Sequence, residues 1–388
     1  MRPIVFDKDP SFWYETLRSF GHIAYGGADF GEVVTTAQRI TEGDYDSWHD
    51  EWLATADRVA GEVGLLDRIG ARDAWLRASN YYRSAEFFLH GDPSDPRIDA
   101  AYARQVACFR KYAEMTGIEP VEIPYEDTAL PGYLYRGTNG ATVVMHNGFD
   151  GSAEEMHFFG AAALHERGYN VLTFDGPGQP GAMRRGLHFR PDWEQVVTPV
   201  LDFLLGLPYV DPEKVALLGA SMGGLLAPRA AAFEPRVKAL IAFDGVYDMG
   251  ALVTEHFGGD REAARQALKD PAADGFIREM MAQNPIVRWA VTHGTWATGT
   301  TPSGYMLAML DYHLGDGIAE RIACPTLVCC APDDFSFQGQ PEALFEHLTC
   351  DKTMIEFSAA EGGDAHCQLG AQRLAMARIA AWLERTFR

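Results

Sequence analysis

The chain has 388 residues, 47% of them hydrophobic and 22% charged, so it can bury the core of two domains or of one domain with a large insertion. It carries 54 Asp and Glu residues against 33 Lys and Arg residues, which gives a formal net charge of -21. This acidic balance disfavours nucleic acid and anionic membrane surfaces as partners, and it is compatible with a small neutral substrate.

The N-terminus, MRPIVFDKDPSFWYE, lacks the basic stretch and the apolar run of a signal peptide. No segment reaches the ~18 unbroken apolar residues that a membrane span requires. The six cysteines show no metal-ligand spacing, and the adjacent Cys329 and Cys330 are typical of a buried strand rather than of a disulfide framework. We therefore expect a cytoplasmic, reduced protein that binds no metal.

Residues 1–120 have helical periodicity and are interpreted as an N-terminal helical cap domain. Asp29 and Glu32 resemble a capping box at the start of one helix, and the GDPSDP segment at 91–96 separates the last two helices. The expected helices cover residues 29–40, 47–63, 72–89 and 97–115.

From residue 121 the pattern changes to short apolar runs that alternate with helical stretches. Such alternation predicts a mostly parallel sheet that is covered on both faces, and residues 121–388 are interpreted as one α/β domain. The expected strands are VEIPYE, GYLYRG, ATVVMH, YNVLTF, KVALLG, VKALIAF, CPTLVCC and TMIEF, and the expected helices lie at 153–167, 192–205, 222–233, 340–349 and 368–386. Residues 245–320, between the sixth and seventh strands, are too many for a loop without structure of its own.

One motif stands between an expected strand and an Ala- and Leu-rich helix. In the string KVALLGASMGGLLAPRAAA, Ser221 is the centre of the only Gly-x-Ser-x-Gly motif in the chain. The glycines of this motif allow a tight turn that exposes the serine oxygen, and the following helix directs its N-terminal dipole at a developing oxyanion. We interpret Ser221 as a catalytic nucleophile. A dinucleotide site at Gly219–Gly224 is not expected, because the motif follows the fifth strand and not the first, and we expect no cofactor.

A serine hydroxyl needs an adjacent imidazole to take its proton. In the chain order Ser, Asp, His that goes with this motif, the histidine follows the eighth strand and the acid the seventh. The loop SAAEGGDAHCQLG after the eighth strand makes His366 the candidate base. Two adjacent aspartates follow the seventh strand; loop position favours Asp334 as the acid, and Asp333 remains the alternative.

An oxyanion hole requires two backbone N–H groups about 3 Å from the developing charge. We expect these from Met222, directly after the nucleophile, and from Phe149 in the loop after the third strand. His146, at the end of that strand, is expected to bond the backbone. Asp175 and Asp244 end the fourth and sixth strands at the same edge; each is expected to brace its turn, with a role in the pocket as the alternative.

The cap and the 245–320 insertion are expected to enclose a substrate. The candidate substrate-binding residues are His22, Tyr25, Tyr82 and Asp175, and further aromatic candidates are Tyr81, Trp289, Trp296 and Tyr305. The competing interpretation is that most of these aromatic residues belong to the hydrophobic core.

The strings HNGFDGSAEEM, FDGPGQ, GASMGG, PDDFSFQGQ and GGDAHCQ, together with GGADFGEVVTTAQRITEGDYDSW near the start, resemble one branch of the α/β-hydrolases. This branch includes 2,6-dihydroxypseudooxynicotine hydrolase and the hydrolases that shorten polyketide chains. The resemblance implies the α/β-hydrolase fold, a mostly parallel eight-stranded sheet with an N-terminal helical cap and a lid inserted after the sixth strand. It also implies a triad of Ser221, Asp334 and His366. Pro180 departs from the pattern, because relatives often have a further glycine there.

The resemblance further implies hydrolysis of a carbon–carbon bond next to a ketone, the reverse of a Claisen condensation, in an aromatic or polyketide-derived 1,3-dicarbonyl substrate. A carboxylesterase, lactonase or thioesterase with the same triad is the alternative, and a non-catalytic small-molecule-binding or regulatory protein is a further one. Relatives are often dimers, so a homodimer is expected.

Overall fold

The computed structural model describes residues 1–334 and 336–388. The chain begins with helices α1 (Pro10–His22), α2 (Phe30–Ala37), α3 (Tyr45–Glu62), α4 (Arg68–Glu86) and α5 (Pro96–Thr116). The four helices expected in this region are present, and α1 precedes them. Each of the five follows an aspartate whose carboxylate accepts a backbone N–H of the first turn: Asp9, Asp29, Asp44, Asp67 and Asp95. Their shared core contains Phe12, Trp48, Trp52 and Phe88.

The rest of the chain forms one eight-stranded sheet, as expected. Its strands are β1 (Glu119–Tyr125), β2 (Thr128–Tyr135), β3 (Thr142–His146), β4 (Asn170–Phe174), β5 (Val215–Ala220), β6 (Ala239–Phe243), β7 (Thr326–Cys330) and β8 (Lys352–Glu356). The spatial order is β1-β2-β4-β3-β5-β6-β7-β8. β1 and β2 form an antiparallel hairpin, β2 pairs antiparallel with β4, and the pairs from β4 to β8 are parallel.

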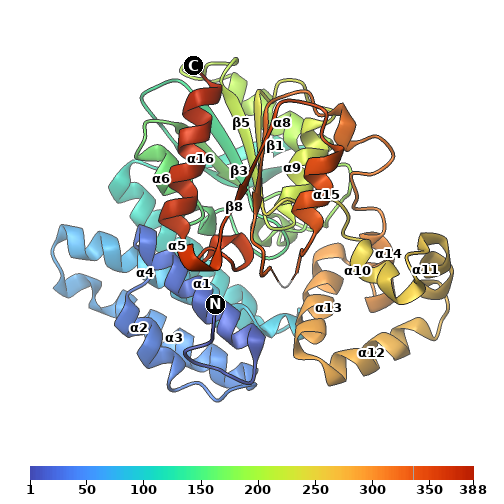
Figure 1. Cartoon of the computed structure of the whole chain (residues 1–388). Coiled ribbons are helices and arrows are strands. Elements are labelled where there is room, and N and C mark those ends of the chain that lie inside the picture. The colour runs from blue at the N-terminus through green and yellow to red at the C-terminus, as the bar shows by residue number, and fades with distance from the viewer. Residues whose placement is uncertain (335) are drawn as a thin grey trace.

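Helices cover both faces of this sheet (Figure 1). Alternate residues of β5 enter opposite cores, since Leu217 packs with α8 (Glu194–Leu205), α9 (Gly223–Ala231) and α15 (Gln340–His347), while Leu218 packs with α6 (Ala161–His165) and α16 (Gln372–Thr386). The central strands are therefore buried on both sides, as their near-continuous apolar runs indicate. A short helix, α7 (Pro180–Met183), follows β4 and begins at Pro180.

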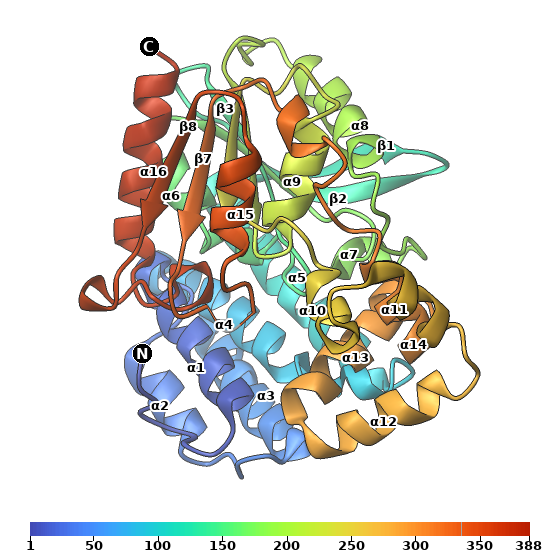
Figure 2. The ribbon, with the colours of Figure 1, turned by 45° about the vertical axis from the view of Figure 1, so that its right-hand side comes forward.

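The long interval between β6 and β7 is helical. It contains α10 (Ala251–Thr254), α11 (Arg261–Leu268), α12 (Ala273–Gln283), α13 (Pro285–Thr298) and α14 (Pro302–Met309). These helices lie beside the N-terminal helices at one end of the sheet (Figure 2). Phe87 and Trp289 join the two groups, with ring centroids 5.0 Å apart and nearly parallel planes.

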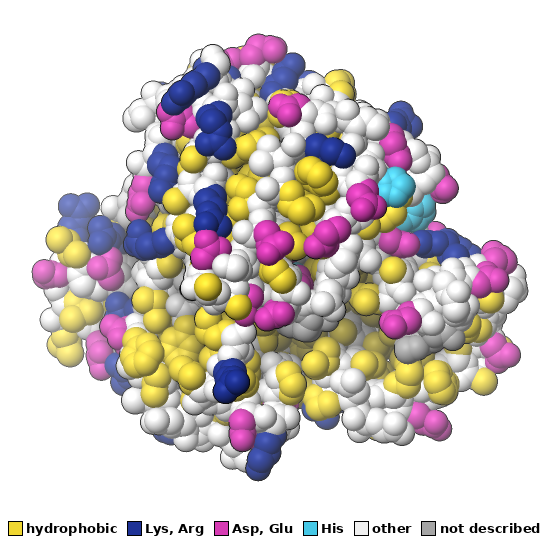
Figure 3. All heavy atoms as spheres, viewed as in Figure 1, with side chains coloured by type: hydrophobic (Ala, Val, Ile, Leu, Met, Phe, Trp, Pro, Cys, Tyr) yellow, Lys and Arg dark blue, Asp and Glu magenta, His cyan; other side chains and the backbone are white. Residues whose placement is uncertain are grey.

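The carboxyl ends of the parallel strands point toward the N-terminal helices and the insertion helices (Figure 2). Ligands of open α/β sheets bind at this edge. Between the sheet and the helices the surface is hollowed, with hydrophobic side chains along the hollow (Figure 3). Within the described part of the chain, no helix is long and apolar enough to cross a membrane.

Candidate active site

Ser221 occupies a strained turn between β5 and α9. Its φ of 61° is in the left-handed region, which a residue with a side chain rarely adopts. A Cβ atom on Gly219 would lie 2.0 Å from the carbonyl oxygen of Gly223, so only glycine fits there. The two features place the serine side chain above the end of the sheet, at the N-terminus of α9.

His366 and Asp334 meet Ser221 in a line of short contacts. The Oγ of Ser221 lies 2.9 Å from Nε2 of His366, and Nδ1 of His366 lies 2.6 Å from Oδ2 of Asp334. The other carboxylate oxygen of Asp334 accepts the backbone N–H groups of Ser336 and Phe337, at 2.7 and 3.2 Å. Asp333 is exposed and is not the aspartate that contacts His366. The structure thus brings together the three residues predicted as a triad.

The electrostatics of the pair suit a proton acceptor with a fixed orientation. Burial alone would lower the pKa of His366, but Asp334, together with Cys367, Tyr14 and Asp244, outweighs it and the pKa is raised well above its ordinary value. Burial likewise raises the pKa of Asp334, and the neighbouring imidazole reverses this, so that the pKa is lowered. Both directions describe an imidazolium–carboxylate pair that is stabilised by its own contact.

A second carboxylate also faces His366. Asp244 follows β6, which lies between the strands of Ser221 and Asp334, and its Oδ2 is 3.2 Å from Nδ1 of His366. It accepts the backbone N–H of Cys367, and its Oδ1 accepts Nε2 of Gln368 at 2.5 Å. Cys367 has a left-handed φ of 53°, so Asp244 holds the backbone in the bend that directly follows the histidine.

The loop that contains Phe149 lies against the turn that contains Met222. A Cβ on Gly148 would be 2.6 Å from the backbone nitrogen of Met222, which shows how closely the loop after β3 approaches the nucleophile turn. Among the described residues, the backbone N–H groups of Met222 and Phe149 have no hydrogen-bond acceptor. Gln179 fixes this loop by donating from Nε2 to the carbonyl oxygens of Asn147 and Gly148, at 2.5 and 3.1 Å.

Ser221, Met222, Phe149 and His366 all line one cavity of about 710 Å³. Its walls are mainly apolar and come from α1, from the loops at the end of the sheet and from the insertion. The large side chains among them include Trp13, Tyr14, Leu17, Phe87, Phe159, Met249, Leu252, Ile286, Trp289, Tyr305 and Phe337. Trp289 and Tyr305 are therefore the two aromatic candidates from the sequence that the structure places at the cavity.

One wall of this cavity is charged. Glu15, Arg18 and Asp150 line it, and the Arg18 guanidinium contacts Asp150 at 2.9 Å, Glu155 at 2.6 Å and Glu15 at 3.2 Å. Arg83 adds contacts to Glu15 and Glu155, at 3.1 and 3.3 Å. The cluster joins α1 and α4 to the segment after β3 and contains three carboxylates for two guanidinium groups.

The four predicted substrate-binding residues are not among the described residues that line this cavity. His22 is fully buried, bonds Asn80 at 2.9 Å and stacks on Phe158. Tyr82 donates to Asp57 at 2.5 Å, and Tyr25 lies under the Arg373 guanidinium. The side chain of Tyr82 packs among the N-terminal helices, whereas those of His22 and Tyr25 pack between these helices and the rest of the chain.

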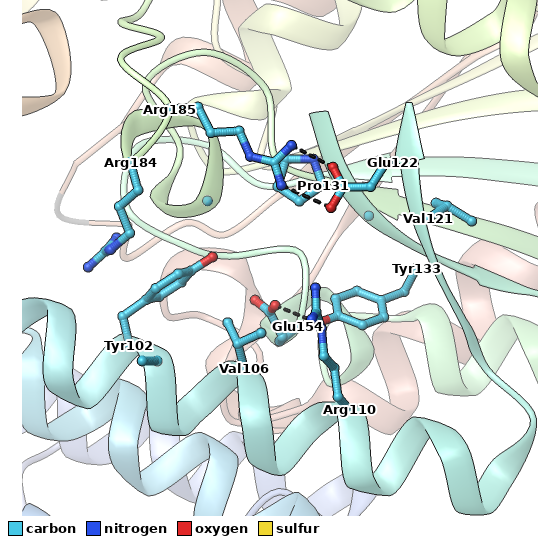
Figure 4. Close-up of a pocket in the computed structure, with 13 residues that line it drawn as sticks. Tyr102, Val106, Arg110, Val121, Glu122, Pro131, Tyr133, Glu154, Arg184 and Arg185 are labelled. Atoms are coloured by element: carbon cyan, nitrogen blue, oxygen red, sulfur yellow. Dashed lines mark hydrogen bonds and ion pairs between the residues drawn. The ribbon is translucent and has the colours of Figure 1, made fainter. Parts of the chain in front are cut away.

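Asp175 and His146 have structural contacts of the kind expected from the sequence. Asp175 accepts the backbone N–H of Gly181 at 2.8 Å and so braces the turn after β4. His146 bonds the Asn147 carbonyl oxygen through Nδ1 at 2.9 Å. Gly181 lines a second cavity of about 430 Å³, which shares no lining residue with the first. Figure 4 shows Tyr102, Glu154 and the Arg185–Glu122 pair around it.

Sequence reasoning did not single out α1, although it supplies much of the cavity wall. Trp13, Tyr14, Leu17 and Arg18 all line the cavity, and their spacing puts them on one face of a helix. That spacing is the signal from which this face can be found. The insertion histidine His293, which bonds the Phe149 carbonyl at 2.8 Å, was also not predicted.

Comparison with known proteins agrees with this geometry. Residues 143–376 match the model of the alpha/beta hydrolase family. A hydrolase of Aspergillus aculeatus is 36% identical over 97% of this chain and 96% of its own length. A 20-hydroxy-prefusarin hydrolase of Gibberella moniliformis is 37% identical over 99% of this chain and 98% of its own length.

Among solved structures, the fold is similar to that of 2,6-dihydroxy-pseudo-oxynicotine hydrolase. The TM-score is 0.71 at 22% sequence identity, over 95% of each chain. This similarity extends over the helical N-terminal region as well as the sheet. The chain therefore belongs to the alpha/beta hydrolase family and is a hydrolase.

Proposed function

We propose that the chain is a serine hydrolase that cleaves a carbon–carbon bond next to a ketone in an aromatic or polyketide-derived 1,3-dicarbonyl substrate. The observation that carries the proposal is the line from Ser221 to His366 to Asp334, with contacts of 2.9 and 2.6 Å, at an apolar cavity of about 710 Å³. A nucleophile, its base and an orienting acid in this arrangement perform acyl transfer.

In the proposed reaction, the Oγ of Ser221 attacks a ketone carbonyl while Nε2 of His366 takes the hydroxyl proton. The Met222 and Phe149 amides stabilise the oxyanion of the tetrahedral intermediate. Collapse of the intermediate breaks the carbon–carbon bond, and the leaving carbon departs as an enol that receives the proton from His366. Water, activated by the now neutral His366, then hydrolyses the acyl-serine and releases a carboxylic acid.

The cavity supports a substrate of this class. Apolar and aromatic side chains form most of its wall, which suits a planar or extended carbon skeleton better than a charged one. The acidic excess in the Glu15–Arg18–Asp150 wall disfavours a substrate that carries a carboxylate there. One relative is named for hydrolysis of 20-hydroxy-prefusarin, and it matches the chain over nearly its whole length.

Ester hydrolysis by the same residues is the second candidate, because an ester needs the same attack and has an easier leaving group. The test compares the turnover of an aryl 1,3-diketone with that of a p-nitrophenyl ester. Both substrates are assayed with the wild type, with Ser221→Ala and with Ser94→Ala. Ser94→Ala is the control, because Ser94 is an exposed serine on the loop before α5. We expect the wild type and the Ser94→Ala control to cleave the diketone with a higher kcat/KM than the ester. We expect Ser221→Ala to cleave neither substrate. If only the ester is cleaved, the proposed carbon–carbon bond hydrolysis is wrong and the enzyme is an esterase.

A further inference from the structure

A line of hydrogen-bonding groups runs from the N-terminal helices through the insertion to the proposed oxyanion loop. Glu86 ends α4, His90 lies in the following turn (Leu89–Gly91), and His293 lies on α13. Oε2 of Glu86 is 2.9 Å from Nε2 of His90, and Nδ1 of His90 is 2.8 Å from Nδ1 of His293. Nε2 of His293 is 2.8 Å from the carbonyl oxygen of Phe149. Three parts of the chain that are far apart in sequence thus meet in three consecutive contacts.

The number of protons in this line follows from its two ends. A carbonyl oxygen accepts only, and an ionised carboxylate also accepts only. Burial would raise the pKa of Glu86, but His90 and Arg184 outweigh it and the pKa is lowered, so Glu86 is a carboxylate at neutral pH. Three hydrogen bonds between two acceptors need three protons, whereas two neutral imidazoles supply two. All three hydrogen bonds can therefore form only when the line holds one proton more than two neutral imidazoles supply.

His90 is the residue that holds the additional proton. Burial and the neighbouring His90 lower the pKa of His293 to about 4, so His293 is neutral and its single N–H is the one that reaches Phe149. His90 must then donate from Nδ1 to His293 and from Nε2 to Glu86. Its exposed fraction is 4% and that of Glu86 is 5%, so water does not readily replace either bond.

The groups that face this line on its other sides leave the assignment unchanged. Arg184 lies 3.8 Å from Oε2 of Glu86, which favours the carboxylate form, and Asp150 lies near His293. The remaining neighbours are Tyr102 of α5 and the rings of Phe87, Phe149, Trp289 and Trp296.

We propose that Glu86, His90 and His293 are positioning residues for the oxyanion loop, and that a doubly protonated His90 fixes the tautomer in which His293 holds the Phe149 carbonyl. The line ties the orientation of this loop to the docking of the cap and the insertion. A line that lacks the third proton lacks one of the three bonds, and the Phe149 carbonyl oxygen is then held less firmly. The effect on turnover rests on the proposed function, in which the Phe149 amide is an oxyanion donor.

Three variants separate this role from simple packing. His293→Phe removes the bond to the carbonyl, and His90→Phe removes the group that fixes its tautomer; each is expected to lower kcat at least about tenfold with little change in KM. Glu86→Gln is the matched control, because its amide N–H donates to Nε2 of a neutral His90 and two neutral imidazoles then complete all three bonds. We expect this variant to keep the wild-type kcat.

The protonation state itself is measured in the wild type by 15N NMR of labelled histidine, with His90→Phe for assignment. The expected signature at pH 7 is an imidazolium at His90 that becomes a neutral ring in Glu86→Gln. A neutral His90 in the wild type would overturn the proposal, as would a His293→Phe enzyme with unchanged kcat or a Glu86→Gln enzyme as impaired as His90→Phe.

If either phenylalanine variant fails to fold, the NMR signatures of the wild type and of Glu86→Gln decide the matter. Failure of the wild type to react with a fluorophosphonate at Ser221 would instead contradict the proposed function, and the NMR experiment would still decide whether the proton line exists.

Discussion

At the scale of single residues, close backbone approach shapes the proposed oxyanion hole. Gly148 leaves no room for a side chain, since a Cβ would meet the Met222 nitrogen at 2.6 Å and the Ala220 carbonyl oxygen at 2.8 Å. Gly148→Ala is therefore expected to displace the loop and to lower kcat by about 10²-fold, the effect of losing one oxyanion donor.

The matched control for this change is Gly61→Ala, because Gly61 is an exposed residue of α3 whose Cβ would meet nothing within 4 Å. Steady-state kinetics should show wild-type kcat in the control, with stability raised by up to about 1 kcal/mol. Equal losses in the two variants would mean that close packing at Gly148 has no specific role.

The two carboxylates at His366 predict a graded pH response. Asp334 raises the pKa of His366, so the histidine loses its proton and becomes a base only as the pH rises through that raised value. Asp334→Asn is expected to move the acidic limb of the labelling rate to lower pH and to reduce the rate by up to about 10⁴-fold through the wrong tautomer.

Asp244→Asn should also shift the acidic limb to lower pH, but by less than Asp334→Asn does. The reason is that Asp244 lies 3.2 Å from Nδ1 of His366, whereas Asp334 lies 2.6 Å from it. The pH dependence of fluorophosphonate labelling measures both effects. An acidic limb that stays at the wild-type pH in Asp334→Asn would show that this carboxylate does not control the imidazole.

At the scale of elements, the buried ion pairs hold α1 against the segment that follows β3. Glu155 accepts two bonds from Arg18, and the guanidinium groups of Arg18 and Arg83 lower its pKa to about 2 in spite of burial, which acts in the opposite direction. Loss of one partner leaves a buried charge uncompensated, so Glu155→Gln should lower the free energy of unfolding by about 3–5 kcal/mol.

Denaturant unfolding of Glu155→Gln measures this loss, and Glu62→Gln is the control. The control removes an exposed partner of Arg58 and should change the free energy of unfolding by less than about 1 kcal/mol. Because the pKa of Glu155 is depressed, its contribution is present above the ordinary pKa of about 4.3 and is lost as the pH falls toward 2. A Glu155→Gln protein as stable as the wild type would contradict the role of this cluster.

The helix α1 also shows why part of the site escapes sequence reasoning. Its inner face buries Glu15, Arg18 and His22, and the sequence does not show which partners from other parts of the chain these charged side chains meet. The eight strands were predictable because each is a short apolar run bounded by turn residues. The choice between Asp333 and Asp334 depended on which way each side chain points, which a loop position favours but a sequence pattern does not determine.

At the scale of the whole molecule, buried neutral histidines couple the free energy of unfolding to pH. Burial lowers the pKa of His22 and His157 to about 3 and that of His146 and His293 to about 4. Between pH 6.5 and 4 such a histidine is protonated when the chain is unfolded and neutral when it is folded. Each one therefore destabilises the folded state as the pH falls, by about 1.4 kcal/mol per pH unit.

His157→Gln isolates one of these contributions, since glutamine can still bond the hydroxyl groups of Tyr112 and Tyr135. Below pH 6.5, the free energy of unfolding of the wild type should fall relative to that of the variant by about 1.4 kcal/mol for each pH unit. Denaturant melts at several pH values provide the measurement, and a difference that is independent of pH would contradict a neutral, buried His157.

Long-range contacts are the part of the molecule that no local pattern encodes. Glu86, His90, His293 and Phe149 come from the cap, the insertion and the sheet edge, and only the folded chain brings them together. The same holds for the cavity, whose walls come from all three parts. The fold and the meeting of Ser221, His366 and Asp334 could be predicted from motifs, whereas the residues that line the cavity depend on how these parts dock.

The central claim is that Ser221 is the nucleophile, and the most direct test is covalent labelling with a fluorophosphonate followed by mass-spectrometric mapping. We predict a single adduct on the Ser221 peptide of the wild type, wild-type labelling in Ser94→Ala and no adduct in Ser221→Ala. A wild type that is not labelled, or a Ser221→Ala protein that is labelled as fast as the wild type, would contradict the account.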